Sequence, residues 1–121
     1  MILQKRYKDS NETSDYVVSS GIFNARLSDN ESFVRRMLKR CLELCNIGTA
    51  LNMISNYVDY KQEDLYYYSP ESIFTFCKTL TKRVSLRHDY MPFEFTVYLY
   101  EDDSIDERHI FSQAYNQLKT G

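Results

Sequence analysis

The stretch FEFTVYLYE, Phe93–Glu101, alternates strictly between apolar and more polar side chains. Phe93, Phe95, Val97 and Leu99 fall on one side of an extended chain, and the intervening residues fall on the other. A period of two predicts a half-buried β-strand with one face against a core. A single strand is not stable alone, so this one requires partner strands.

The expected partners of this strand lie near the N-terminus. Ile2–Tyr7 begins with apolar residues, and Tyr16–Phe23 contains two short apolar runs, Tyr16–Val18 and Gly21–Phe23. Gly21 suits a turn between these runs. Pairing of these segments with Phe93–Tyr100 would give a small antiparallel sheet.

Three other segments of the chain have helical patterns. In Ser69-Pro70-Glu71 a capping residue, a proline at the first helical position and an acidic residue mark a helix start. The apolar residues that follow recur every three or four positions up to Val84, which predicts a helix ending near Leu86–Asp89.

An earlier helix is predicted to begin at the capping box formed by Ser28 and Glu31. Its apolar stripe runs from Val34 to Leu51 and continues to about Tyr60, with Gly48 marking either a close contact or a break. Lys61–Tyr68 is less regular and is expected to be a connection.

A C-terminal helix is predicted from Ser104 onward by the apolar set Ile110, Phe111, Ala114, Tyr115 and Leu118. Together these elements predict an α+β fold, in which a small antiparallel sheet packs against three or four helices. A length of 121 residues fits a single domain, 1–121.

The composition argues against several classes of function. With 3 Gly in the chain no glycine-rich loop for phosphates can be built, and the net charge of −2 does not indicate a globally basic nucleic-acid binder. Cys41, Cys45 and Cys77 lie at apolar positions, which predicts free core thiols and a reducing, cytoplasmic location. No metal, cofactor or membrane association is expected.

Tyrosine is over-represented, with 11 residues that include a dense group between Tyr57 and Tyr68. Tyrosine is enriched where proteins meet partners, and acidic residues steer basic partners. The favoured hypothesis is therefore a non-enzymatic protein-binding module that occludes a partner with a basic surface: an inhibitor, immunity protein or viral accessory protein. The predicted contact residues are Tyr98, Tyr100, Asp102, Asp103 and Asp106, with Tyr66, Tyr67 and Tyr68 as a second patch.

Two alternatives remain open. Basic side chains on the two long helices, interleaved in sequence with Tyr66–Tyr68, could bind single-stranded nucleic acid by charge and stacking. That set is Arg35, Arg36, Lys39, Arg40, Lys78, Lys82 and Arg83. The second alternative is a small enzyme of unknown reaction, with His88 or His109 as general base and Asp89 or Asp106 as the orienting carboxylate.

Overall fold

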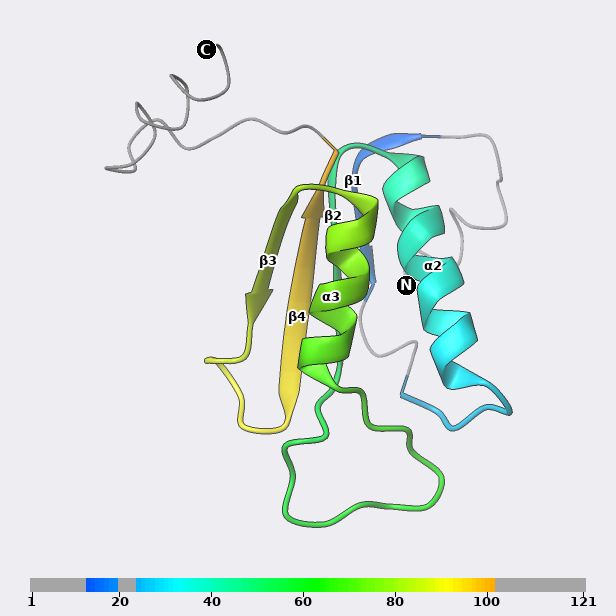
Figure 1. The fold of residues 1–121 in the computed structure, drawn as a ribbon, viewed down its shortest axis with the longest axis vertical. Helices are drawn as coiled ribbons and strands as arrows, with labels where there is room; N and C mark the ends of the chain where they lie inside the picture. The colour runs from blue at the N-terminus through cyan, green and yellow to red at the C-terminus, as the bar shows by residue number, and fades with distance from the viewer. Residues whose placement is uncertain (1–12, 20–23, 102–121) are drawn as a thin grey trace.

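The computed structural model describes residues 13–19 and 24–101. Their elements follow the order β1 (Ser14–Ser19), α2 (Asn30–Leu44), β2 (Cys45–Ile54), α3 (Pro70–Leu80), β3 (Arg83–Arg87) and β4 (Glu94–Tyr100) (Figure 1). The α+β class is confirmed. The described residues contain two helices, and the predicted C-terminal helix lies outside them.

The four strands form one sheet with the order β1-β2-β4-β3. β1 and β2 are parallel, and β4 runs antiparallel to both β2 and β3. β1, β2 and β3 therefore point in the same direction. The expectation of an antiparallel sheet is correct for the two pairings of β4 and wrong for β1 and β2. These two strands are parallel because α2 carries the chain from the end of β1 back to the level where β1 began.

β4 is the strand that the alternating sequence predicts, but its predicted partners were wrong. It lies between β2 and β3, with Val97 opposite Leu51 on one side and Leu86 on the other. The predicted strand at Tyr16–Val18 forms as part of β1, at the sheet edge beyond β2. Segments 2–7 and 21–23 lie outside the described residues.

The first long helix ends at Leu44, and β2 follows it directly where a continuing helix was expected. The residues Leu51 and Met53 fit a strand period as well as a helix stripe. Within β2, Gly48 allows β4 to approach closely. A Cβ at this position would lie 3.0 Å from the Leu99 carbonyl oxygen and 3.1 Å from Cδ1 of Tyr100. The close-contact interpretation of this glycine is confirmed.

Both described helices begin at a side chain that caps the first turn. Ser69 caps α3 by accepting a hydrogen bond from the Ser72 amide at 3.2 Å, with Pro70 at the first position. For α2 the cap is Asp29, which accepts from the Ser32 amide at 3.0 Å, rather than the predicted Ser28. α3 ends at Leu80, before the predicted end near Leu86–Asp89, because Val84 and Leu86 belong to β3.

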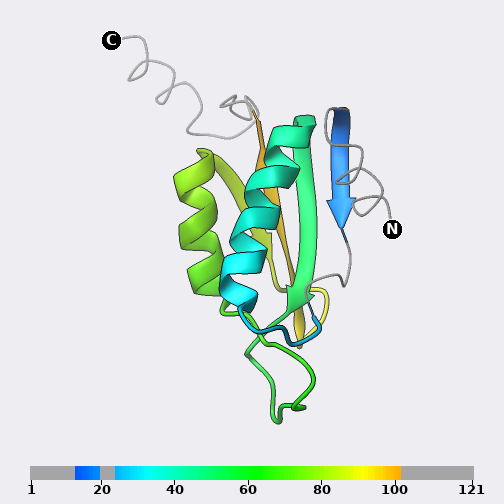
Figure 2. The ribbon, with the colours of Figure 1, turned by 90° about the vertical axis from the view of Figure 1, so that its right-hand side faces the viewer.

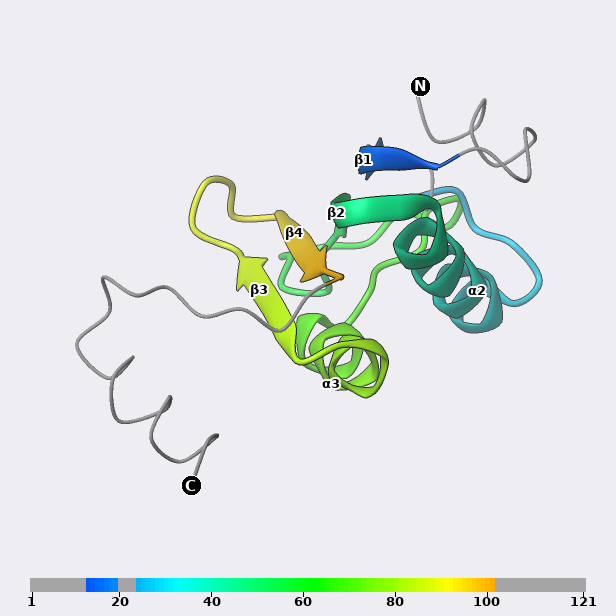
Figure 3. The ribbon, with the colours of Figure 1, turned by 90° about the horizontal axis from the view of Figure 1, so that it is seen from above.

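Both described helices lie on one face of the sheet (Figures 2 and 3). The core forms between this face and the helices, and its fully buried members include Leu38, Leu51, Phe95 and Leu99. The three cysteines are buried in the same core, as the sequence predicts. Burial raises the pKa of Cys41 and of Cys77 to about 12, and that of Cys45 to about 11.

Neither described helix has the length and apolar character that crossing a membrane requires.

Candidate functional site

The carboxyl ends of the three parallel strands lie at one edge of the sheet. Two loops project there, residues 55–69 after β2 and residues 88–93 after β3, and they are the green and yellow connections at the bottom of Figure 1. In sheets built from parallel strands joined by helices, ligands bind outside the carboxyl ends of the strands. This edge is therefore the first place to look for a site.

The loop 55–69 has defined structure. Its two ends meet where Ser55 and Tyr68 form a β-bridge, and the Tyr68 amide donates to the Ile54 carbonyl at 2.9 Å. Farther out, a second bridge joins Leu65 to Ala25. The Arg26 side chain donates to the carbonyl oxygens of residues 63 and 65, at 2.8 and 3.2 Å. The loop is thus held at its base and along one side.

Tyr66 and Tyr68 fasten this loop to the start of α2. Tyr68 is fully buried, and its hydroxyl accepts a hydrogen bond from Nδ2 of Asn30 at 3.2 Å. The Tyr66 hydroxyl donates to the Glu31 carboxylate at 2.5 Å. Burial, and then the hydrogen bond to this carboxylate, raise the pKa of Tyr66 to about 12. The hydroxyls of both tyrosines therefore serve contacts within the chain.

His88 joins the two loops. One of its ring nitrogens lies 2.8 Å from Oγ of Ser55, which also accepts the Tyr57 amide hydrogen bond at 3.1 Å. The Tyr57 hydroxyl donates to the Glu71 carboxylate, and this hydrogen bond lowers the pKa of Glu71. Because Ser55 is fully buried, we interpret the pair as a structural link between the loops.

Asp89, the carboxylate predicted to orient His88, pairs instead with Arg87 at 3.1 Å. The hydrogen bond from Arg87 lowers the pKa of Asp89. His109 and Asp106, the other predicted general base and its carboxylate, lie outside the described residues.

A pocket of about 460 Å³ opens between the two loops. Aromatic rings form much of its lining, the polar lining residues are Asp59 and Gln62, and the others are aliphatic or proline. The rings belong to Tyr57, Tyr60, Tyr67 and Phe93. We call this the edge pocket.

Apolar side chains are unusually exposed around the edge pocket. Tyr60 is 75% exposed, Tyr57 is 59% exposed and Phe93 is 50% exposed. Tyr90 and Met91, which precede Phe93 in the second loop, are also exposed. Clustered exposed apolar side chains mark a binding surface more often than scattered ones do.

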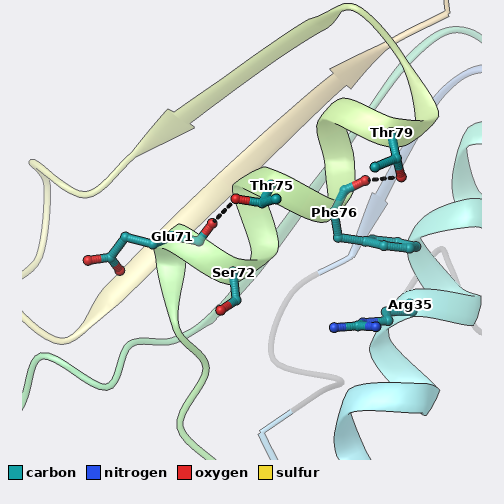
Figure 4. A pocket seen from close by; sticks show the side chains of 6 residues that line it. All are labelled: Arg35, Glu71, Ser72, Thr75, Phe76 and Thr79. Carbon is teal, nitrogen blue, oxygen red and sulfur yellow. Dashed lines mark hydrogen bonds between the residues drawn. The ribbon is translucent and has the colours of Figure 1, made fainter.

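A second hollow, of about 400 Å³, lies between α2 and α3 (Figure 4). The Arg35 guanidinium lies 5.4 Å from the centre of the Phe76 ring. The Thr75 and Thr79 hydroxyls donate to carbonyl oxygens of α3, at 2.9 and 2.6 Å. The polar groups of this hollow are thus largely engaged with the protein itself.

Several of the basic residues predicted to bind nucleic acid make contacts within the chain. Arg83 lies over the Tyr100 ring, with its guanidinium carbon 4.3 Å from the ring centre. Lys78 donates to the Lys82 carbonyl at 2.6 Å, and Arg40 pairs with Glu43 at 3.6 Å. Arg36 lies 3.4 Å from the Ser32 hydroxyl, and Lys39 is exposed on α2.

Tyr98 and Tyr100 lie on the sheet face opposite the helices. Both are half-buried, and the Tyr100 ring lies against Gly48. The backbone of β4 is paired on both sides, so it offers no free edge to another chain. Asp102, Asp103 and Asp106 lie outside the described residues. Tyr67 differs from its neighbours, because it faces the edge pocket.

Comparison with known proteins identifies a similar protein. The chain is 36% identical over 91 residues to a Mycobacterium tuberculosis protein named "Putative methyltransferase Rv1506c". The aligned stretch covers 69% of this chain and 55% of that relative, so the chain spans about half the length of the curated relative it matches. No family model and no solved structure matches the chain.

This similarity contradicts the favoured hypothesis from sequence. The relative carries the name of an enzyme, whereas we expected a non-enzymatic module acting by steric occlusion. Nothing in the comparisons supports an inhibitor, an immunity protein or a viral accessory protein. Several of the tyrosines that prompted that hypothesis either hold the loop 55–69 in place or line the edge pocket.

Proposed function

We propose that this chain is part of a methyltransferase and that its edge pocket receives the methyl acceptor. The observation that carries the proposal is the 36% identity over 91 residues to the Mycobacterium tuberculosis protein. The fold agrees with it, since the parallel unit β1-α2-β2 places a pocket at the carboxyl edge, where such sheets bind ligands.

The pocket is suited to the acceptor. It has the size and the mainly apolar lining of small-molecule sites, with a few polar groups to orient a ligand. Among the described residues the one glycine, Gly48, lies within β2 and not in a loop. A glycine-rich nucleotide loop is therefore not found in residues 13–19 and 24–101, and we place the acceptor rather than the methyl donor at the edge pocket.

The three free core cysteines agree with action in a reducing compartment, and we propose the cytoplasm.

The experiment is a methyl-transfer assay of the protein. S-adenosylmethionine is incubated with the protein and a small-molecule extract, and release of S-adenosylhomocysteine is measured. We expect turnover by the wild type and an about tenfold lower rate of release in the double variant Tyr60→Ala/Phe93→Ala, because both rings line the pocket.

Tyr16→Ala is the matched control. Tyr16 is 60% exposed, similar to the pocket tyrosines, but lies on β1 at the sheet edge. We expect wild-type turnover from this variant. Equal turnover by the wild type and the double variant would move the acceptor away from the edge pocket, and no turnover by a folded wild-type protein would contradict the proposed function.

A further inference from the structure

We infer that the acceptor bound in the edge pocket is an amine, held through its positive charge; this assignment of substrate class rests on the proposed function. The observations are the chemistry of the lining, the charge of the loop that forms it, and a cation–ring contact that the loop already makes.

The lining favours a cation over a neutral or anionic group. Four of the ten lining residues are aromatic, one is the carboxylate Asp59, and none is lysine, arginine or histidine. The faces of aromatic rings attract ammonium groups, and cages of several rings recognise methylated ammonium groups in particular. A carboxylate beside such rings adds direct charge attraction.

The charge of the loop points the same way. Residues 55–69 contain three carboxylates, Asp59, Glu63 and Asp64, against one lysine. Arg26, which lies against this loop, is directed to its backbone carbonyl groups and to the Tyr66 ring, 5.7 Å from the ring centre, and does not line the pocket. The local field therefore attracts a cationic ligand.

One ring of the pocket already contacts an ammonium group. Nζ of Lys61 lies 5.7 Å from the centre of the Tyr67 ring. This distance is within the range of a cation–ring interaction. Tyr57, Tyr60 and Phe93 have no such contact with a lysine or arginine among the described residues, and their exposure leaves them accessible to a ligand.

Methyl transfer to an amine would use this environment throughout. The bound ammonium group first loses one proton to water, and the lone pair of the resulting neutral amine attacks the methyl carbon of a methylsulfonium donor. The carbon–sulfur bond breaks with its electron pair passing to sulfur. The positive charge moves from sulfur to nitrogen, and the product is the methylated ammonium ion. Aromatic faces and Asp59 stabilise the charge where it develops on nitrogen.

The test compares choline with 3,3-dimethylbutan-1-ol, a neutral molecule of nearly the same shape. Binding of each probe to the wild-type chain is measured by NMR titration at constant ionic strength. We expect choline to bind about tenfold more tightly, since two or three partly exposed cation–ring contacts and one carboxylate contribute. Equal or tighter binding of the neutral probe, or binding of neither, would overturn the inference.

Two variants locate the interaction. Asp59→Asn removes the charge at nearly constant size, so we expect choline affinity to fall several-fold and affinity for the neutral probe to stay unchanged. Tyr60→Leu removes a ring but keeps apolar volume, and we expect the same selective loss. Unchanged choline affinity in both variants would place the cation elsewhere and contradict the inference.

The two proposals fail separately. Choline binding without any methyl transfer would contradict the proposed function and leave the ligand class of the pocket intact. Methyl transfer by a protein that prefers the neutral probe would support the function and contradict the amine as acceptor.

Discussion

Ser55 gives the most informative test of how the edge pocket is held. The Ser55→Ala substitution removes an Oγ that lies 2.8 Å from a ring nitrogen of His88 and accepts the Tyr57 amide hydrogen bond at 3.1 Å. Ser55 is fully buried, so water cannot readily take the place of the hydroxyl. The change in side-chain volume is small, and the cost therefore reports on hydrogen bonding.

The magnitude follows from the two partners. Each intramolecular hydrogen bond contributes about 0.5–1.5 kcal/mol, and a buried partner left unsatisfied costs about 1–3 kcal/mol. His88 is only half-buried and recovers some hydration, so we expect a loss of about 2 kcal/mol in the free energy of unfolding. For a chain of this size the melting temperature would fall by roughly 6–12 °C.

The assay is urea unfolding followed by circular dichroism, with Ser85→Ala as the matched control. Ser85 lies on β3 and is exposed, so its substitution should change the unfolding free energy by less than about 0.5 kcal/mol. We also expect faster amide hydrogen exchange at Tyr57 in Ser55→Ala. A loss below 0.5 kcal/mol, with unchanged exchange, would refute the view that Ser55 and His88 link the two loops.

Three further substitutions or conditions test the fold. Gly48→Ala should lower the unfolding free energy by about 1–2 kcal/mol in urea titrations, because its Cβ would press on the Leu99 carbonyl and the Tyr100 ring; a neutral effect would contradict the close contact. Tyr66→Phe should cost about 1 kcal/mol through loss of the partly exposed hydrogen bond to Glu31, whereas Tyr60→Phe, at an exposed position, should cost almost nothing; equal effects would contradict the anchoring role. Burial raises the pKa values of the cysteines from 9.0 to about 11 or 12. The stability that the protonated thiols contribute is therefore complete below pH 9 and declines as the pH rises from there toward 12. Stability that increases across this range in thermal melts, or rapid alkylation of the native thiols at about pH 8, would contradict their burial.

The elements that local sequence predicts well are those with one clear period or a distinct start. β4 is found from its strict alternation, and α3 from Ser69 and Pro70. β2 is missed because Thr49, Leu51 and Met53 lie in a stretch whose apolar spacing also fits the end of a helix. The preference is decided by long-range pairing with β1 and β4, which local sequence does not contain.

The edge pocket is harder to predict, since its two loops are separated in sequence. Tyr57, Tyr60 and Tyr67 come from the first loop and Phe93 from the second. They meet because β2 and β4 pair, which brings the Ser55 amide within 2.9 Å of the Phe93 carbonyl. The tyrosine-rich stretch gives a signal, but composition alone does not separate the rings that line the pocket from Tyr68, which is buried at the base of the loop.

The most direct test of methyl transfer at this site uses S-adenosylmethionine with a ¹³C-labelled methyl group. The protein is incubated with the donor and a panel of small amines, and the products are followed by NMR. We predict that the label appears as an N-methyl signal in the wild-type and Tyr16→Ala reactions and is lost in Tyr60→Ala/Phe93→Ala. A donor that stays intact with folded wild-type protein, across both the amine panel and a small-molecule extract, would contradict the account.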